Sequence, residues 1–450
     1  MRILPPLLVV ALAVVIGCCA EAAPIMDGSH VSEMTLDNGL RVIVKHEPYW
    51  GLVTFGFCVK ASPLYESDSQ RGLSDLVRYM MFDVAPAGSE RFEDYVEDLG
   101  GSFDSYTSPD ATQIRCTTSA FSFPEVLPRL VKATLEPRFD EGLWAQKLQE
   151  LRRRLLDAQT QPMTRMYSLL WETAFRQHPY GRPIAGTADG IAAYTSQSLA
   201  DFHKALYVPN NMSLIVVGDV TPQAVFDLAK ANLTSYPSRS LKLPVVVPEP
   251  TQTEPRTRLE KAPVRGTLVT YAWRAVDVRN KRDVCTLDVL YTLLGEGENS
   301  RLTKALLERE QVSAVPEVEF ITKRDQGLFV VTCISKTEAE FETRETVLSE
   351  VAKLRDTPVS AEELAKAKAV LKAGYAFDSQ SYSSQFGSMA FYEAIDSYRF
   401  AMDYAAEVDR VTVEDVQRVA KTCLDPEKYN LVIIRPRSGG ETSKEARLIP

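Results

Sequence analysis

The chain is poor in histidine, and its histidines are too far apart to form a zinc motif. Zinc hydrolases commonly place two histidines close together on one helix, as in H-x-x-E-H and H-E-x-x-H. No such pair occurs among the 450 residues. Each histidine is therefore better explained as a structural or surface residue than as a metal ligand. The four are His30, His46, His178 and His203.

The sequence also lacks the short motifs of several other enzyme classes. It has no G-x-S-x-G nucleophile elbow, no P-loop and no glycine-rich dinucleotide motif. It has no C-x-x-C pair, which argues against a zinc ribbon or a dithiol redox site. Basic runs are short, the densest being Arg152-Arg153-Arg154, and the net charge is −9. This charge balance argues against a dedicated nucleic-acid surface.

The N-terminal residues 1–22 are predicted to be a signal peptide and not part of the fold. Leu7 to Ile16 form an apolar stretch that is too short to span a membrane comfortably. Two cleavage sites remain open. A lipobox would make Cys18 the lipidated first residue, whereas Ala20-Glu21-Ala22 is an ordinary cleavage site. In both cases we expect export, either to a periplasm or to the envelope as a lipoprotein anchored only through Cys18.

The length of the chain predicts two domains. Alternating runs, such as those around the Asn38-Gly39 turn, indicate antiparallel strands, and helical patterns follow them. This combination predicts an α+β fold with helices on one face of each sheet. A proline-rich linker at 236–263 is expected to separate a domain at 25–235 from one at 264–436, with a polar tail at 437–450. The second half weakly repeats the order of the first, which suggests an internal duplication.

Two cysteines in strand-like runs of the first half, Cys58 and Cys116, could be neighbours. In an oxidising compartment they could form a disulfide. A pair of buried free thiols is the equally weighted alternative.

A predicted helix at 72–82 carries the most informative pattern in the chain. Its polar face places Asp75, Arg78 and Tyr79 at i, i+3 and i+4. These are the offsets of His, Glu and His in the inverted zinc motif H-x-x-E-H. The opposite stripe is typical of a buried amphipathic helix. It consists of Leu73, Leu76, Val77, Met80 and Met81.

The three polar residues of this helix are unsuited to hold zinc. A catalytic zinc ion needs about three nitrogen, carboxylate or thiolate ligands and one open position. Asp75 could serve as a ligand, but Arg78 places a permanent positive charge one turn away. Tyr79 is neutral near pH 7, and Arg78 cannot act as a general base. We therefore interpret Asp75 and Arg78 as an ion pair, and we predict no catalytic residue and no metal site on this helix.

Several segments along the chain together resemble the insulinase/pitrilysin family, which includes the mitochondrial processing peptidases. The resemblance covers nearly all of residues 33–436. It implies two homologous insulinase-type domains, each a mainly antiparallel sheet with helices packed on one face. It also implies zinc in active members, although none is expected here. Besides 72–82, the segments are 39–44, 100–101, 178–183, 207–211, 215–219 and 293–302.

The resemblance also indicates where a third zinc ligand and a substrate clamp would lie. The family's third ligand, a Glu, matches Arg154 or Leu155, and the nearest carboxylates are Glu150 and Asp157. The family also holds the substrate backbone with an Arg and a Tyr. The two matching positions in this chain carry neither residue, which suggests that the clamp is lost as well. They are occupied by Leu307 and Ala314.

Three functional hypotheses follow from these replacements. The first is a non-catalytic subunit that pairs with a zinc-bearing relative or with itself and contributes to a chamber for extended peptides. The second is a structural or scaffolding envelope protein of the same fold. The third, which we weight least, is an active peptidase with an atypical site.

Overall fold

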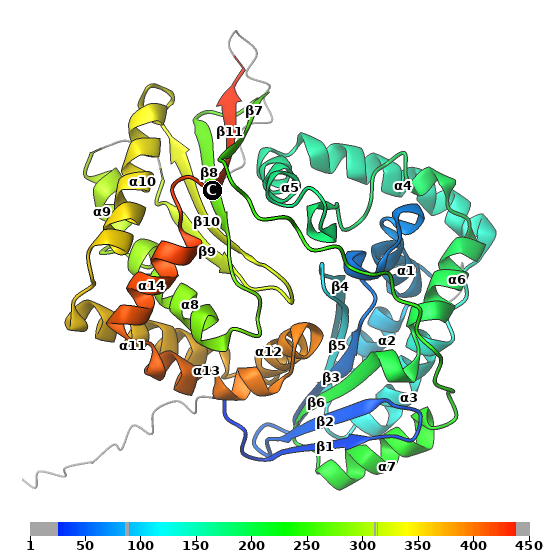
Figure 1. The fold of residues 1–450 in the computed structure, drawn as a ribbon. Coiled ribbons are helices and arrows are strands. Elements are labelled where there is room, and N and C mark those ends of the chain that lie inside the picture. The colour runs from blue at the N-terminus through cyan, green and yellow to red at the C-terminus, as the bar shows by residue number, and fades with distance from the viewer. Residues whose placement is uncertain (1–25, 86–89, 310–311, 313, 438–450) are drawn as a thin grey trace, which may run out of the picture.

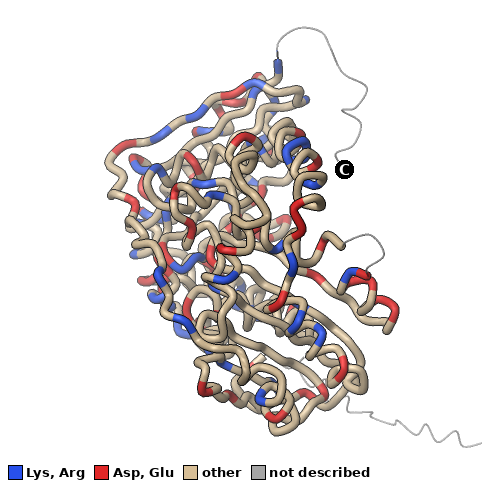
Figure 2. The backbone as a smooth tube through the Cα atoms, turned by 90° about the vertical axis from the view of Figure 1, so that its right-hand side faces the viewer, with Lys and Arg blue, Asp and Glu red and all other residues tan. Residues whose placement is uncertain are grey.

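Most of the chain after the predicted signal peptide is described by the computed structural model. The predicted signal peptide at 1–22, with Cys18, lies outside the described residues, as does nearly all of the predicted tail. No helix among the described residues is both long and apolar enough to cross a membrane. Lys and Arg are interspersed with Asp and Glu along the chain (Figure 2). The described residues are 26–85, 90–309, 312 and 314–437.

The first of two sheets consists of six strands in the order β1-β2-β6-β3-β5-β4. Neighbouring strands are antiparallel except β2 and β6, which run parallel. The predicted turn at Asn38-Gly39 joins β1 to β2, and Gly39 has a φ of +85°, a conformation that favours glycine. The strands are β1 (Val31–Thr35), β2 (Arg41–His46), β3 (Leu52–Val59), β4 (Ser102–Thr107), β5 (Thr112–Ser119) and β6 (Met212–Gly218).

Most helices of the first half pack on the outer face of this sheet (Figure 1). The predicted amphipathic helix is α1, and its apolar stripe lies in the core of this half. The helices are α1 (Leu73–Phe82), α2 (Phe92–Asp98), α3 (Phe123–Leu135), α4 (Glu141–Thr160), α5 (Pro162–Ala174), α6 (Ser196–Leu206) and α7 (Pro222–Leu233).

The second sheet consists of five strands in the order β7-β11-β8-β10-β9. It is antiparallel except for the parallel pair β7 and β11. Its strands are β7 (Arg256–Ala262), β8 (Thr267–Arg274), β9 (Glu317–Ile321), β10 (Leu328–Ser335) and β11 (Tyr429–Pro436). Its helices are α8 (Lys281–Gly295), α9 (Arg301–Leu307), α10 (Glu340–Asp356), α11 (Ala361–Asp378), α12 (Tyr382–Ile395), α13 (Arg399–Arg410) and α14 (Val413–Cys423).

The two sheets have the same topology, as an internal duplication requires. Five strands of the first sheet, β2-β6-β3-β5-β4, correspond in order and direction to β7-β11-β8-β10-β9. Each repeat has one parallel pair, formed by its first and last common strands. The helix that follows the second common strand is α1 in the first repeat and α8 in the second. The predicted α+β fold of two homologous domains is confirmed.

Each half contributes one helix to the inner face of the other half's sheet. Helix α5 packs on β11, β7 and β8, and helix α12 packs on β3, β6 and β5. In Figure 1 both helices lie between the sheets, whereas most other helices lie on the outer sides. The helices occupy equivalent places in the repeat, because α5 follows α4 as α12 follows α11. This exchange of α5 and α12 joins the halves through apolar contacts. Met166 of α5 and Phe386 of α12 are both buried in the resulting cores.

Several features of the chain differ from the sequence predictions. The predicted linker at 236–263 extends too far, because residues 256–262 form strand β7. Backbone pairing with β11 stabilises this strand. The sequence pattern also did not reveal β9, α7, α12 and α13. For the cysteines, the disulfide alternative is wrong. Cys58 and Cys116 lie on neighbouring strands but face opposite sides of the sheet, and both are free buried thiols.

Candidate functional site

Helix α1 begins at a glycine that the surrounding chain requires. Gly72 has a φ of +91°, and a Cβ atom there would lie 2.8 Å from the carbonyl group of Ala185. The buried Glu66 carboxylate accepts hydrogen bonds from the N–H groups of Gly72 and Ser74, both at 2.8 Å. Burial raises the pKa of Glu66 despite these hydrogen bonds. A carboxylate at this end also interacts favourably with the helix dipole, so the start of α1 is fixed.

Arg78 occupies the centre of the polar face of α1. Its Nε donates to Asp75 Oδ1 at 3.0 Å, and its Nη1 donates to Asp83 Oδ2, also at 3.0 Å. Nη1 also donates to Ser105 on β4, at 3.3 Å to Oγ and 3.4 Å to the carbonyl oxygen. Only 12% of the Arg78 side chain is exposed. Burial alone would lower the pKa of Arg78, but the two carboxylates raise it overall.

Tyr79, the third polar position, faces helix α4. The guanidinium carbon of Arg154 lies 5.7 Å from the centre of the Tyr79 ring, within cation–π range. Burial raises the pKa of Tyr79, and the nearby Glu150 acts in the same direction. The phenol is therefore neutral at physiological pH. Of the two predicted third-ligand positions, Arg154 and Leu155, Arg154 is the one that approaches α1.

The carboxylates nearest to the third-ligand position are not directed into a common site. Glu150 is paired with Lys147, with 2.9 Å between Oε2 and Nζ, and this hydrogen bond lowers the pKa of Glu150. Asp157 is exposed on the last turns of α4. Leu155 packs against the core of the first half.

The residues present at this site do not fit zinc. Asp75 already accepts a hydrogen bond from Arg78, and two cationic groups, Arg78 and Arg154, flank the position where a metal would lie. Among the described residues, no three His, Cys, Asp or Glu side chains are grouped so that they could hold a metal ion. A catalytic zinc site needs about three such ligands. The arrangement can bind or exclude charged groups, but it offers no general base on α1.

The two positions assigned to a substrate clamp carry no polar side chain. Leu307 is the last residue of α9 and is 39% exposed. Ala314 is exposed in the segment before β9. Neither residue can donate a hydrogen bond from its side chain to a peptide backbone.

No two of the four histidine side chains share a hydrogen-bond partner among the described residues. His30 is exposed, with a φ of 58°. His46 Nδ1 lies 2.8 Å from the Val220 carbonyl oxygen. His203 is buried, with its Nε2 hydrogen-bonded to the Thr134 carbonyl at 2.8 Å, and burial lowers its pKa to about 4. These contacts are structural.

His178 belongs to a polar junction between the halves that the sequence did not reveal. Its Nδ1 accepts from the Tyr180 N–H at 3.2 Å, so its Nε2 carries the proton and donates to Asp325 at 3.1 Å. Arg324 also donates to Asp325, at 2.8 Å. The segment 322–327, which joins β9 to β10, thus packs against residues 178–183, one of the segments that resemble the family.

The buried end of this junction holds a charged pair. Lys323 and Asp110 are both almost fully buried, with 3.8 Å between Nζ and Oδ2. Burial raises the pKa of Asp110 and lowers that of Lys323. Isolated charged residues in a turn give no sequence pattern, so Lys323, Arg324 and Asp325 were missed. Asp83 and Ser105, which hold Arg78, were missed because neither belongs to the spacing pattern on α1: Asp83 follows the helix and Ser105 lies on β4.

Comparisons with known proteins match the chain almost from end to end. The model of "Insulinase (Peptidase family M16)" matches residues 41–188, and that of "Peptidase M16 inactive domain" matches residues 193–371. "Zinc protease PqqE" of Helicobacter pylori is 26% identical over 414 residues, which cover 90% of this chain and 92% of that protein.

Solved structures give the same result for the fold. The crystal structure of a protease from Helicobacter pylori has a TM-score of 0.83 and 25% identity, and covers 90% of this chain and 99% of that one. A structure described as the peptidase M16 inactive domain from Pseudomonas fluorescens has a TM-score of 0.81 and 20% identity, over 91% and 99% of the two chains.

Proposed function

The chain belongs to the insulinase family of M16 peptidases, and on that premise we propose that it is an exported member without peptidase activity. It pairs with a zinc-bearing relative, or with a second copy of itself, and contributes to a chamber that takes extended peptides. Export uses residues 1–22, and Cys18 is the lipidated residue if the lipobox is used.

One observation carries the loss of activity. The polar face of α1 is filled by an Arg78 that is hydrogen-bonded on three sides, to Asp75, Asp83 and Ser105. Hydrolysis by a zinc peptidase requires a metal-bound water and a general base, and this face offers one possible ligand, Asp75, and no base. Binding of a peptide does not require them.

Peptide capture is supported by the sheet edges. Strands β4 and β9 are edge strands, each with one side not paired to another strand of its sheet. An extended peptide can add to such an edge through backbone hydrogen bonds. Strand β4 also contacts α1 through Ser105, so a peptide at this edge would pass beside the altered helix.

The proposal is tested by purifying the tagged full-length protein from its own organism at native expression level. We expect less than about one-tenth of a zinc ion per chain by elemental analysis, because about three ligands are needed for stable binding. We also expect a co-purifying insulinase-family chain that contains an intact H-x-x-E-H. Reconstitution of the two purified chains should restore chelator-sensitive cleavage of an unstructured peptide.

Specific results would contradict this proposal. Chelator-sensitive peptidase activity of this chain alone, with one zinc lost on Asp75→Ala, would support the atypical peptidase. A chain that purifies without any relative, bound to envelope components only, would support the scaffolding alternative. An intact Met1 in a cytosolic fraction, seen by mass spectrometry, would contradict export.

A further inference from the structure

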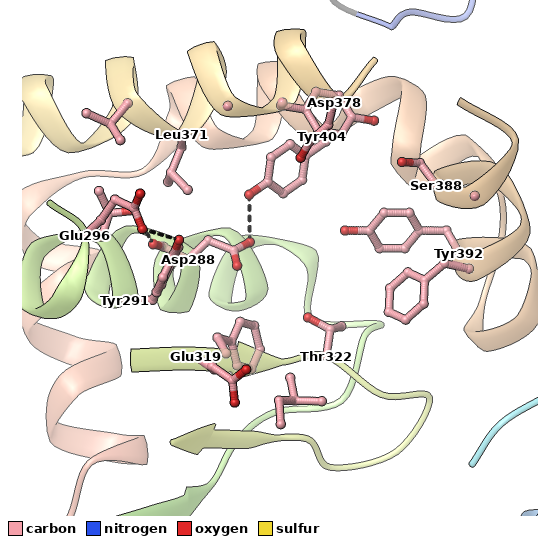
Figure 3. Close-up of a pocket in the computed structure, with 18 of the residues that line it drawn as sticks. Asp288, Tyr291, Glu296, Glu319, Thr322, Leu371, Asp378, Ser388, Tyr392 and Tyr404 are labelled. Atoms are coloured by element: carbon pink, nitrogen blue, oxygen red, sulfur yellow. Dashed lines mark hydrogen bonds between the residues drawn. The ribbon is translucent and has the colours of Figure 1, made fainter. Parts of the chain in front are cut away.

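The second repeat contains a cavity of about 670 Å³ beside α8 and α11, the helices that correspond to α1 and α4 of the first repeat. It lies between helices α8, α11, α12 and α13 and the edge strand β9 (Figure 3). Asp288 and Tyr404 lie in its interior, whereas Glu296, Val370 and Asp378 are exposed at its rim. None of these residues belongs to the predicted site.

The internal duplication places Asp288 where Asp75 stands in the first repeat. Helix α8 follows β8 as α1 follows β3, and α8 packs on β9 as α1 packs on β4. On α8 the polar residues at i, i+3 and i+4 are Asp288, Tyr291 and Thr292. The intervening apolar pairs also correspond. They are Leu76-Val77 and Met80-Met81 in α1, and Val289-Leu290 and Leu293-Leu294 in α8.

Two glycines leave space open beside α8 in the second repeat. Aligning the starts of α5 and α12 matches Arg154 with Gly374 and Tyr167 with Gly387. A Cβ atom at Gly374 would meet no other atom within 4 Å, and one at Gly387 would meet only a terminal nitrogen of Arg115 at 3.7 Å. In the first repeat, the corresponding volume beside α1 is occupied by the Arg154 side chain over Tyr79.

The cavity is lined by carboxylates whose only described partners are neutral. Asp288 Oδ2 accepts from the Tyr404 hydroxyl at 2.9 Å, and Glu296 accepts from Tyr291 at 2.6 Å. Glu319 accepts from Tyr167, a residue of α5, at 2.8 Å. Among the described residues, none of these three carboxylates forms a salt bridge. Lys323 also lines the cavity, but its ammonium group is paired with Asp110.

Aromatic groups complete the walls of the cavity. Tyr375, Tyr392, Phe320 and Phe391 line it together with Leu371. The hydroxyl of Tyr392 points toward Asp288 and Tyr404 (Figure 3) and has no hydrogen-bond partner among the described residues. Carboxylates combined with aromatic rings are the surroundings that organic cations prefer.

We propose that this cavity binds an alkylammonium or guanidinium group, with its charge at Asp288 and its alkyl chain along the aromatic wall. The carboxylates are too dispersed to share a metal, since no three His, Cys, Asp or Glu side chains of the described residues form a metal-binding group. A cation that spans several ångströms can reach Asp288 and the rim carboxylates in turn. The inference does not depend on the proposed pairing with a relative.

The electrostatics of Asp288 support this ligand. Burial raises the pKa of Asp288 to about 7, and the hydrogen bond from Tyr404 offsets this only in part. A carboxyl group in this state gains a favourable partner when a cation enters, because the cation stabilises its charged form. Such a cation comes either from a lysine or arginine side chain of a peptide or from a free small amine.

The experiment is calorimetric titration of the full mature chain at pH 8 with matched probes. The free-amine probes are n-butylamine and n-butylguanidine. The peptide probes are end-blocked pentapeptides of alanine with one central lysine or arginine. The neutral controls are n-pentanol and the pentapeptide with central norleucine. We expect a dissociation constant of about 1 mM or tighter for a cationic probe, and no binding of its neutral match.

Three variants locate the binding. Asp288→Asn should weaken it about tenfold or more, because it removes the charge and keeps the shape. Gly374→Leu should block the cavity without disturbing α11, because the space beside Gly374 is empty and leucine favours helices. Asp403→Asn is the matched control, since Asp403 is exposed on α13 and carries no described ion pair or hydrogen bond.

The outcomes decide between the sources as well. Binding of the cationic peptides alone would assign the cavity to a basic side chain, and binding of the free amines alone would assign it to small amines. Equal binding of neutral and cationic probes would overturn the proposal. So would unchanged affinity in both Asp288→Asn and Gly374→Leu, a loss as large in Asp403→Asn, or no binding of any probe at about 10 mM.

Discussion

The two repeats treat the same helix position in opposite ways. In the first, Asp75 is neutralised by Arg78, and Arg154 covers Tyr79. In the second, Asp288 at the equivalent place has only the Tyr404 hydroxyl as its partner among the described residues, and it lines an open cavity. The first position is closed by the protein's own charges, and the second is left available to a ligand.

This difference shows that a helix position without a group of zinc ligands need not be an empty pocket. On α1, Asp75 and Arg78 pair with each other and Tyr79 lies under Arg154, so this polar face is part of the packed structure. Each such pair contributes little to stability on its own when it is partly exposed. In the second repeat, by contrast, small residues keep the volume open. Charge and side-chain size together decide which repeat can still bind.

The comparison depends on the halves being equivalent, and the exchanged helices test this most strongly. Met166 on α5 and Phe386 on α12 are matched positions, and both are essentially fully buried. We expect Met166→Ala to cost about 2–5 kcal/mol and Phe386→Ala about 3–5 kcal/mol, through lost burial and residual cavities. Urea unfolding followed by far-ultraviolet circular dichroism measures both costs.

The exchange also predicts how the halves unfold. Because each helix belongs to the core of the other half, each variant should shift a single common transition. The control is Phe377→Ala on α11, where the side chain is 68% exposed, and it should change stability by less than about 0.5 kcal/mol. Two separate transitions, with only one moved by each variant, would show that the halves are independent.

The second test concerns Asp288 and the pH dependence of stability. Its pKa is raised by burial from an ordinary value of 3.8 to about 7 in the folded protein. The unfolded chain therefore loses this proton first as the pH rises, and the folded state loses stability between about pH 4 and 7. The difference between the two pKa values limits this loss in the free energy of unfolding to about 4 kcal/mol. Water in the cavity should reduce the loss to about 2 kcal/mol.

Asp288→Asn should remove this loss, because asparagine resembles the protonated carboxyl. We expect the variant to be about 2 kcal/mol more stable than the wild type at pH 8 and equal to it near pH 4. The groups whose pKa responds to the charge of Asp288 are Tyr291, Tyr392, Tyr404 and Cys285, and burial raises the pKa of each, so they stay neutral. Denaturant titrations at four pH values measure the difference. A destabilised variant at pH 8 would show that Asp288 already has a cationic partner.

Removing a charge from the matched helix of the first repeat, α1, should have a smaller effect of opposite sign. Arg78→Met removes the hydrogen bonds to Asp75, Asp83 and Ser105. We expect a loss of about 1 kcal/mol, because the carboxylates of Asp75 and Asp83 are partly exposed and can regain water. Arg71→Met is the control, since Arg71 is exposed and its side chain pairs only with Asp68 among the described residues. If Arg78→Met lowered the free energy of unfolding no more than the control does, Arg78 would have no structural role.

The sequence predicted the fold well and the new cavity not at all. Local patterns predicted the strands and helices around the motif on α1, because such patterns do not depend on the packing of distant segments. They are the apolar stripe of α1, the Asn38-Gly39 turn and the ordered segments that resemble the family. Strand β7 has a polar, exposed pattern and exists because β11 pairs with it. The cavity depends on Gly374 and Gly387, which are ordinary in a helix until the packing of α8 and α12 is known. The repeat of Asp288, Tyr291 and Thr292 after Asp75, Arg78 and Tyr79 was the one available signal.

The smallest effect is expected from rebuilding the inverted motif itself. The triple change Asp75→His, Arg78→Glu and Tyr79→His restores H-x-x-E-H on a helix whose apolar face is already correct. We expect weak zinc affinity and no turnover of unstructured peptides. Two protein ligands fall short of the usual three, and Arg154 approaches the site with a positive charge. Zinc binding is measured by competition with a chromogenic chelator, and turnover with a fluorogenic peptide.

The quadruple variant that adds Arg154→Glu separates the two shortfalls. It supplies a third ligand on the side of α4 that faces α1, so zinc affinity should increase by about tenfold or more over the triple variant. Turnover should still be absent, because Leu307 and Ala314 cannot align a peptide, and orientation contributes several kcal/mol to such reactions. Cleavage by the triple variant, abolished by a chelator, would instead show that a native carboxylate already serves as third ligand. Glu150→Gln and Asp157→Asn in the triple background would then identify which one, and the second repeat would no longer be the only one able to bind.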